Sequence, residues 1–115
     1  MTNSRRKGAG GERELASILR AAGFSARRGQ QYSGASGDAD VIGLPGIHIE
    51  CKRTERLCLW DALAQSQADA RTGEMPVVIH RANDCPWVVV LGLEDFLALY
   101  RESGLIEKGG QINGL

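Results

Sequence analysis

The sequence predicts an α/β domain in which a central mixed β-sheet is flanked by helices. Stretches with apolar residues at helical spacing alternate along the chain with short apolar stretches that are typical of strands. A length of 115 residues suffices for one compact core. We expect a single domain over residues 9–103, after a flexible basic arm at 1–8 and before a glycine-rich tail at 104–115.

Three helices are predicted from the period of their apolar residues, over residues 11–22, 59–71 and 93–100. In the first, Leu15, Ile18 and Leu19 recur at helical spacing and Gly23 ends the pattern. One face of the second carries Trp60, Leu63, Ala64, Gln67 and Ala68. An amide on a core-facing stripe needs a partner, so Gln67 is a candidate for active-site support, with a satisfied boundary amide as the alternative.

Five strands are predicted, over residues 24–28, 38–44, 47–53, 76–80 and 87–91. Pro45 and Gly46 form a turn signal between the second and third strands, which indicates a hairpin. Residues 29–37 are rich in Gly and Ser and are predicted to form a mobile loop.

Composition and charge favour a phosphate-binding protein of a reducing compartment over a membrane, secreted or zinc-binding protein. Residues 1–60 carry ten Lys and Arg against six Asp and Glu, whereas residues 61–115 carry four against eight. The basic half is suited to binding phosphates, although such asymmetry also arises by chance. Three cysteines without a CxxC pair fit a reducing cytoplasm and argue against disulfides or a zinc site. The sequence has neither a membrane-length apolar run nor a secretory signal.

The most informative stretch joins two aspartates to a Glu-Cys-Lys sequence across the predicted turn. Because side chains alternate on a strand, Glu50 and Lys52 share a face and approach an aspartate on the neighbouring strand. Asp38 and Asp40 also share a face, so alternation does not choose between them. Two carboxylates and the backbone carbonyl of Cys51 are suitable ligands for Mg²⁺ or Mn²⁺.

Such a cluster can hydrolyse a phosphodiester. A bound metal ion lowers the pKa of water and neutralises charge on phosphate. Lys52 can orient or deprotonate the attacking water, or stabilise the phosphate. The alternative is a surface hairpin with an ordinary Glu–Lys ion pair.

A third carboxylate can come from the first helix. Glu12 and Glu14 lie at opposite edges of its apolar stripe, and either can reach inward. The alternative for both is a role in solubility or in favourable interaction with the helix dipole.

The combined pattern resembles the archaeal-type Holliday junction resolvases and their bacteriophage relatives, within the PD-(D/E)XK nucleases. The resemblance covers roughly residues 7–100, and its matching elements are Lys7-Gly8, Glu12-Arg13, Gly23-Phe24, Arg28, Asp40-Val41-Ile42 and Ile49-Glu50-Cys51-Lys52. It implies a restriction-endonuclease-like core, a homodimer and action on four-way DNA junctions in the cytoplasm, which is the host cytoplasm for a bacteriophage protein.

The resemblance also implies roles for individual residues. It selects Glu12 and Asp40, together with Glu50, as metal ligands and Lys52 as the catalytic lysine. The family often has a catalytic serine on the loop before the aspartate, for which Ser36 and Ser33 both qualify. The family uses arginines at the positions of Arg13 and Arg28 for junction binding.

DNA contacts are expected mainly at phosphates, since branched DNA is read by its shape. The candidates are Arg5, Arg6, Lys7, Arg13, Arg28, Ser33, Arg53 and Arg56. Two symmetric cuts call for a twofold dimer. Its apolar contacts are sought among Trp87, Val89, Leu91 and Phe96, for which the alternative is the domain core. The rival functions are a nuclease for flaps, nicks or duplex DNA, and an inactive DNA-binding relative.

Overall fold

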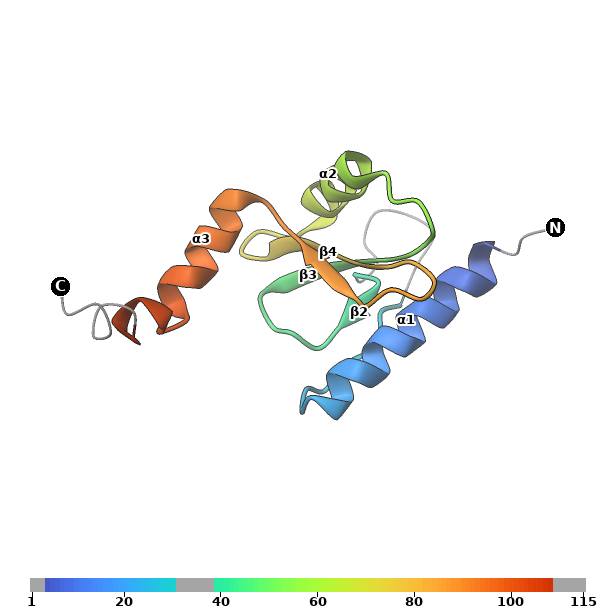
Figure 1. Cartoon of the computed structure of the whole chain (residues 1–115), viewed down its shortest axis with the longest axis horizontal. Coiled ribbons are helices and arrows are strands. Elements are labelled where there is room, and N and C mark those ends of the chain that lie inside the picture. The colour runs from blue at the N-terminus through green and yellow to red at the C-terminus, as the bar shows by residue number, and fades with distance from the viewer. Residues whose placement is uncertain (1–3, 31–38, 109–115) are drawn as a thin grey trace.

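The computed structural model describes residues 4–30 and 39–108, and the side chains from residue 8 onward within these ranges. Five strands form one sheet in the order β1-β2-β3-β4-β5, with helices around it (Figure 1). The elements are α1 (Ser4–Ala21), β1 (Arg27–Arg28), β2 (Val41–Ile42), β3 (Ile47–Arg53), α2 (Leu59–Asp69), β4 (Met75–Arg81), β5 (Val88–Val90) and α3 (Leu93–Glu102).

The sheet is mixed, as predicted. β3 and β4 run parallel over seven paired positions and are connected through α2, whereas the other neighbouring pairs are antiparallel. The hairpin between β2 and β3 is confirmed, with Val41 opposite Ile49. Gly46 has a φ of 85° in the turn, a conformation that favours glycine.

Helices α1 and α2 cover opposite faces of the sheet. Leu15 and Ala16 of α1 pack in the larger apolar cluster, which includes Ile49 and Cys51 of β3 and Val77 and Ile79 of β4. On the other face, the buried residues Ala62, Leu63 and Val78 form a smaller cluster between α2 and β4. Successive residues of β3 therefore face α1 and α2 in turn, which explains why this strand is buried over most of its length.

Helix α1 begins earlier than the sequence predicted. Its first residue is Ser4, so the part of the predicted arm from residue 4 onward is helical. Gly8, Gly10 and Gly11 favoured a later start because glycine is a poor helix former. Gly11 has a packing role instead: a Cβ atom at this position would overlap the Cβ of Arg53 on β3.

The predicted buried face of α2 was wrong for every residue except Leu63. Its buried residues are Ala62, Leu63 and Ser66, whereas Trp60 is 78% exposed and Gln67 is also exposed. Alanines lie on both sides of the helix, so the apolar residues did not define a single stripe. The large apolar side chain of Trp60 was assigned to the core, and this placed the predicted stripe on the wrong side. The buried hydroxyl of Ser66 donates to the carbonyl oxygen of Val77 at 3.0 Å. Ser66, and not Gln67, is therefore the polar residue on the core-facing side of α2.

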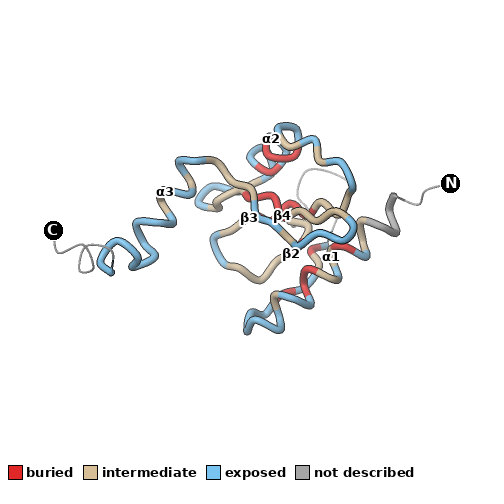
Figure 2. Tube along the Cα trace, in the orientation of Figure 1, coloured by how far each residue is buried: buried red, intermediate tan, exposed pale blue. Residues whose placement is uncertain are grey.

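Helix α3 extends away from the sheet and buries none of its side chains (Figures 1 and 2). Of the residues predicted to be available for dimer contacts, Trp87 and Leu91 pack against the larger apolar cluster. Val89 and Phe96 are 58% and 50% exposed. Leu93 is 69% exposed, so an apolar surface continues from β5 along α3.

No helix within residues 4–30 and 39–108 has both the length and the apolar character needed to cross a membrane.

Candidate active site

Strand β3 presents His48, Glu50 and Lys52 on its α2 side, while Ile49 and Cys51 face the core beneath α1. Glu50 is 5% exposed, an unusual environment for a carboxylate. The Nζ of Lys52 lies 3.7 Å from Oε2 of Glu50. The predicted Glu–Lys pair is therefore formed, and its carboxylate is buried rather than on a solvated hairpin surface.

Asp40 lies just before β2 and faces the middle of β3. Its backbone N–H donates to the carbonyl oxygen of Ile49 at 3.1 Å, and its Oδ2 accepts from the N–H of Cys51 at 2.8 Å. Burial raises the pKa of Asp40, although the hydrogen bond from Cys51 and the charges of Lys52 and His48 act in the opposite direction. These contacts bring Asp40 to the same part of the strand as Glu50. Asp38, the alternative left open by alternation, lies outside the described residues.

Glu12 reaches this cluster from α1. Its Oε1 accepts a hydrogen bond from Nε of Arg28 at 2.8 Å. Burial raises the pKa of Glu12, and the negative charge of Asp40 raises it further, although Arg28 acts in the opposite direction.

Glu14 has a different environment. Its carboxylate accepts hydrogen bonds from Arg81 of β4 and from the indole N–H of Trp87. Burial tends to raise the pKa of Glu14, but these two hydrogen bonds and the charges of Arg81 and Arg53 together lower it. Glu14 therefore joins α1 to Arg81 of β4 and to Trp87, whereas Glu12 is joined to Arg28 of β1.

The cluster concentrates negative charge in a poorly solvated place. Burial raises the pKa of Glu50 to about 7, and the charges of Asp40 and Asp69 contribute in the same direction. Lys52 only partly compensates. Such crowding of carboxylates is the environment in which a bound cation removes the repulsion.

The donor set fits a divalent metal ion. Asp40 and Glu50 supply the hard oxygen donors that Mg²⁺ and Mn²⁺ prefer, and their shared desolvation favours a positive partner. A second group suited to a metal consists of His48, Glu50 and Asp69, with ligand atoms all within 4.8 Å of one another. Both arrangements use the buried Glu50.

Comparison with known proteins decides the family. Residues 3–59 match the family model described as archaeal Holliday junction resolvase (Hjc), a stretch that includes Glu12, Asp40, Glu50 and Lys52. The chain belongs to the archaeal-type Holliday junction resolvases. A solved structure of Hjc, a Holliday junction resolvase from the archaeal hyperthermophile Archaeoglobus fulgidus, is 28% identical with a TM-score of 0.56. The match covers 74% of this chain and 72% of the Archaeoglobus chain. None of the curated proteins compared with the chain matches it.

Membership in the resolvase family confirms the resemblance carried by the sequence motifs. The family is one of nucleases, and its restriction-endonuclease-like fold agrees with the mixed sheet and its flanking helices. A bacteriophage origin stays a prediction.

The arginines predicted to contact DNA have different surroundings in this chain. Arg13 and Arg56 are exposed, and Arg28 is partly exposed while bound to Glu12. Arg53 donates to Oδ1 of Asn83 at 2.8 Å and lies 3.6 Å from a carboxylate oxygen of Glu55. These protein contacts occupy Arg53, so it is the weakest of the four as a phosphate ligand. The side chains of Arg5, Arg6 and Lys7, and both Ser33 and Ser36, lie outside the described residues.

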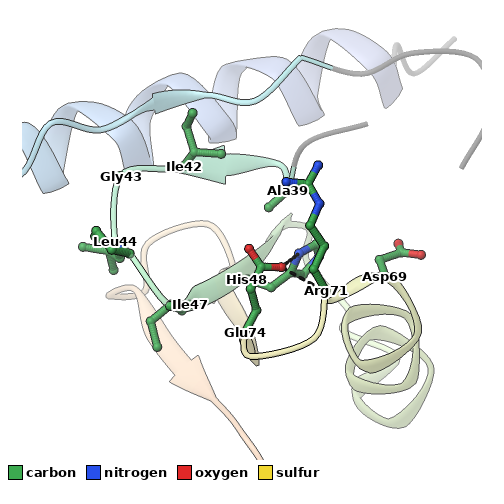
Figure 3. A pocket seen from close by; sticks show the side chains of 11 residues that line it. Ala39, Ile42, Gly43, Leu44, Ile47, His48, Asp69, Arg71 and Glu74 are labelled. Carbon is green, nitrogen blue, oxygen red and sulfur yellow. Dashed lines mark hydrogen bonds and ion pairs between the residues drawn. The ribbon is translucent and has the colours of Figure 1, made fainter. Parts of the chain in front are cut away.

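Two residues of the site were missed in the sequence. His48 is two residues before Glu50 and so occupies the same strand face, a relation that strand alternation alone gives. Asp69 is the last residue of α2, and its position depends on how that helix packs. A cavity of about 180 Å³ adjoins both, and its lining includes Arg71 and Glu74 (Figure 3).

Proposed function

We propose that this protein is a divalent-metal-dependent endonuclease that resolves four-way DNA junctions as a homodimer. The observation that carries the proposal is that Asp40 is hydrogen-bonded to the middle of β3, where Glu50 and Lys52 form an ion pair, in a chain of the resolvase family. Glu12 is the candidate third carboxylate, and Arg28 holds its side chain through a hydrogen bond of 2.8 Å.

In this proposal Asp40 and Glu50 hold the ion, with the backbone carbonyl of Cys51 and the carboxylate of Glu12 as further ligands. When bound, Mg²⁺ or Mn²⁺ supplies a water of lowered pKa and neutralises charge on the scissile phosphate. The hydrogen bond from the N–H of Cys51 fixes the orientation of the Asp40 carboxylate, so this ligand is held in place before DNA arrives.

Lys52 is suited to act on the attacking water or on the phosphate. Its side chain is about one-third exposed, and its ammonium group is 3.7 Å from Glu50. It can therefore reach a phosphate at the surface while the buried carboxylate keeps it positioned. An ammonium group here stabilises the extra negative charge of the pentavalent phosphate.

A homodimer supplies the second cut that junction resolution requires. One site cleaves one strand, and a twofold axis places an identical site at the symmetric strand. The apolar surface of β5 and α3, in which Val89, Leu93 and Phe96 are exposed, is the surface that we assign to this contact.

The test compares a synthetic four-way junction with linear duplex of the same sequence, with and without Mg²⁺. We expect the junction to be cut in preference, and cutting to require the metal. Asp40→Asn and Glu50→Gln should each reduce cleavage roughly 100-fold or more while junction binding persists, because they remove charge that acts on the transition state. Asp61→Asn, which changes an exposed carboxylate on α2, is the matched control.

Each alternative gives a distinct result. Equal cutting of junction and duplex would favour a nuclease for another DNA structure. Junction binding without cleavage by the parent protein would indicate an inactive DNA-binding relative. Parent-level cleavage by both acidic-site variants would refute the assigned site.

A further inference from the structure

We propose that His48, Glu50 and Asp69 form a second divalent-metal position that takes a transition-metal ion such as Mn²⁺ through a histidine nitrogen. The inference rests on the proposed nuclease function, because it adds a metal position to the same site through the shared Glu50. It names two ligands, His48 and Asp69, that lie outside the residues carrying the resolvase motif.

The first support is geometric. A ring nitrogen of His48 and carboxylate oxygens of Glu50 and Asp69 all lie within 4.8 Å of one another. Two ligands on opposite sides of one ion are about 4 Å apart at ordinary metal–ligand lengths, so a small closure is sufficient. The three residues come from the middle of β3 and the end of α2, two elements that pack together.

The second support is an unsatisfied nitrogen. His48 is 5% exposed, and its Nε2 is buried without a hydrogen-bond partner among the described residues. A buried polar atom of this kind calls for a water or an ion. An imidazole nitrogen beside two carboxylates is a natural ligand for a divalent transition metal.

The other ring nitrogen of His48 faces a carboxylate. Nδ1 lies 3.6 Å from Oε1 of Glu74, and the two side chains are directed toward each other in Figure 3. The same Oε1 accepts the backbone N–H of Arg71 at 2.8 Å, which fixes the position of Glu74. A carboxylate at the outer nitrogen favours the proton on Nδ1 and leaves Nε2 as the ligand, as in many metal-bound histidines.

Space and charge also suit an ion. The cavity of about 180 Å³ adjoins this position, since His48 and Asp69 line it, and it offers room for the waters that a bound ion keeps. Asp40 and Lys52 contribute to the charged surroundings, and Arg71 and Glu74 also line the cavity. A histidine ligand distinguishes this position from an all-oxygen site, and it favours Mn²⁺ over Mg²⁺.

The experiment uses the full chain, freed of metal by a chelator and loaded with Mn²⁺ alone. Pulsed electron paramagnetic resonance should show a directly bound histidine nitrogen, and its signature should change when the protein is made with ¹⁵N-histidine. The chain has two histidines. We expect His48→Gln to abolish the coupling and His80→Gln to preserve it.

Affinity provides the second measurement. Asp69→Asn should weaken Mn²⁺ binding at this position about tenfold or more, whereas Asp61→Asn, on the same helix, should leave it unchanged. Asp69 is exposed, so its variant should fold even if the buried His48 does not tolerate substitution. The ratio of Mn²⁺ to Mg²⁺ affinity should fall in both His48→Gln and Asp69→Asn.

Failure of this inference can be distinguished from failure of the nuclease proposal. Mn²⁺ bound without histidine coupling, no Mn²⁺ binding, or equal affinities of the Asp69 and Asp61 variants would overturn the second position. Asp40→Asn should retain the histidine coupling while losing cleavage of the junction. Cleavage by Asp40→Asn at the parent rate would instead count against the catalytic assignment.

Discussion

Glu50 is the carboxylate of the site with the most strongly raised pKa. Its side chain is buried beside Asp40, and its pKa is raised to about 7 from an ordinary value of 4.5. In the metal-free protein, the unfolded chain therefore loses this proton at lower pH than the folded chain does. As pH rises from about 4.5 to 7, the free energy of unfolding should fall, by an amount on the order of 3 kcal/mol.

Glu50→Gln tests this directly. The amide cannot ionise, so the metal-free variant should lose less stability than the parent between pH 5 and pH 8. Urea denaturation at both pH values measures the difference, and added Mg²⁺ should restabilise the parent more than the variant. Identical pH dependence in the two proteins would mean that Glu50 is not the group responsible. Asp40 and Glu12, whose pKa values are also raised, will keep part of the slope in both.

At the residue scale, strand alternation was sufficient to place Glu50 and Lys52 together, because both lie on one regular strand. Helical periodicity was insufficient to choose between Glu12 and Glu14, since both edges of the apolar stripe of α1 face protein. The structure separates them by their partners: Arg28 holds one and Arg81 with Trp87 the other. Those partners come from distant parts of the chain, so local periodicity carries no information about them.

At the scale of elements, the closest approach of α1 to the sheet depends on Gly11. A side chain there would overlap Arg53 Cβ, whereas a Cβ at Gly10 would have no atom within 4 Å. Gly11→Ala should therefore lower the free energy of unfolding by about 1–3 kcal/mol through overpacking. Gly10→Ala should raise it by up to about 1 kcal/mol, because alanine is the better helix former.

Thermal denaturation of the two variants against the parent measures both effects. The pair is informative because the substitutions are identical and adjacent on one helix. If Gly11→Ala is as stable as Gly10→Ala, α1 does not approach β3 as closely as the structure describes.

Elements with one regular period were predictable, and those decided by tertiary contact were not. The bounds of β3 were predicted correctly, because its apolar residues alternate with polar ones and a clear turn signal precedes the strand. The stripe of α2 was misplaced because Ala62 and Ala64 are equally apolar, and the packing against Val78 selects the first. The start of α1 was misplaced because glycine there serves close packing rather than a break.

For the molecule as a whole, the apolar surface of β5 and α3 is the surface that the proposed homodimer would bury. The proposed homodimer predicts that Phe96→Asp, at a residue 50% exposed on α3, will shift the protein toward monomer. Light scattering coupled to size-exclusion chromatography gives the mass of each form. Ile18→Asp, at an exposed apolar residue of α1, is the control and should leave the mass unchanged.

Junction cleavage links this measurement to function. The monomeric variant should make single nicks rather than paired cuts, because each active site is retained while the twofold arrangement is lost. A parent protein that is monomeric at micromolar concentration in the presence of junction DNA would contradict the dimer.

The lack of buried side chains on α3 has a consequence for folding. Its ten residues are shorter than an isolated helix needs to persist in water. Docking against a second copy would supply the missing contacts, so the segment would gain its helical order on association and lose it on dilution. Part of the secondary structure of each subunit would then be a property of the pair, and far-ultraviolet circular dichroism would vary with protein concentration.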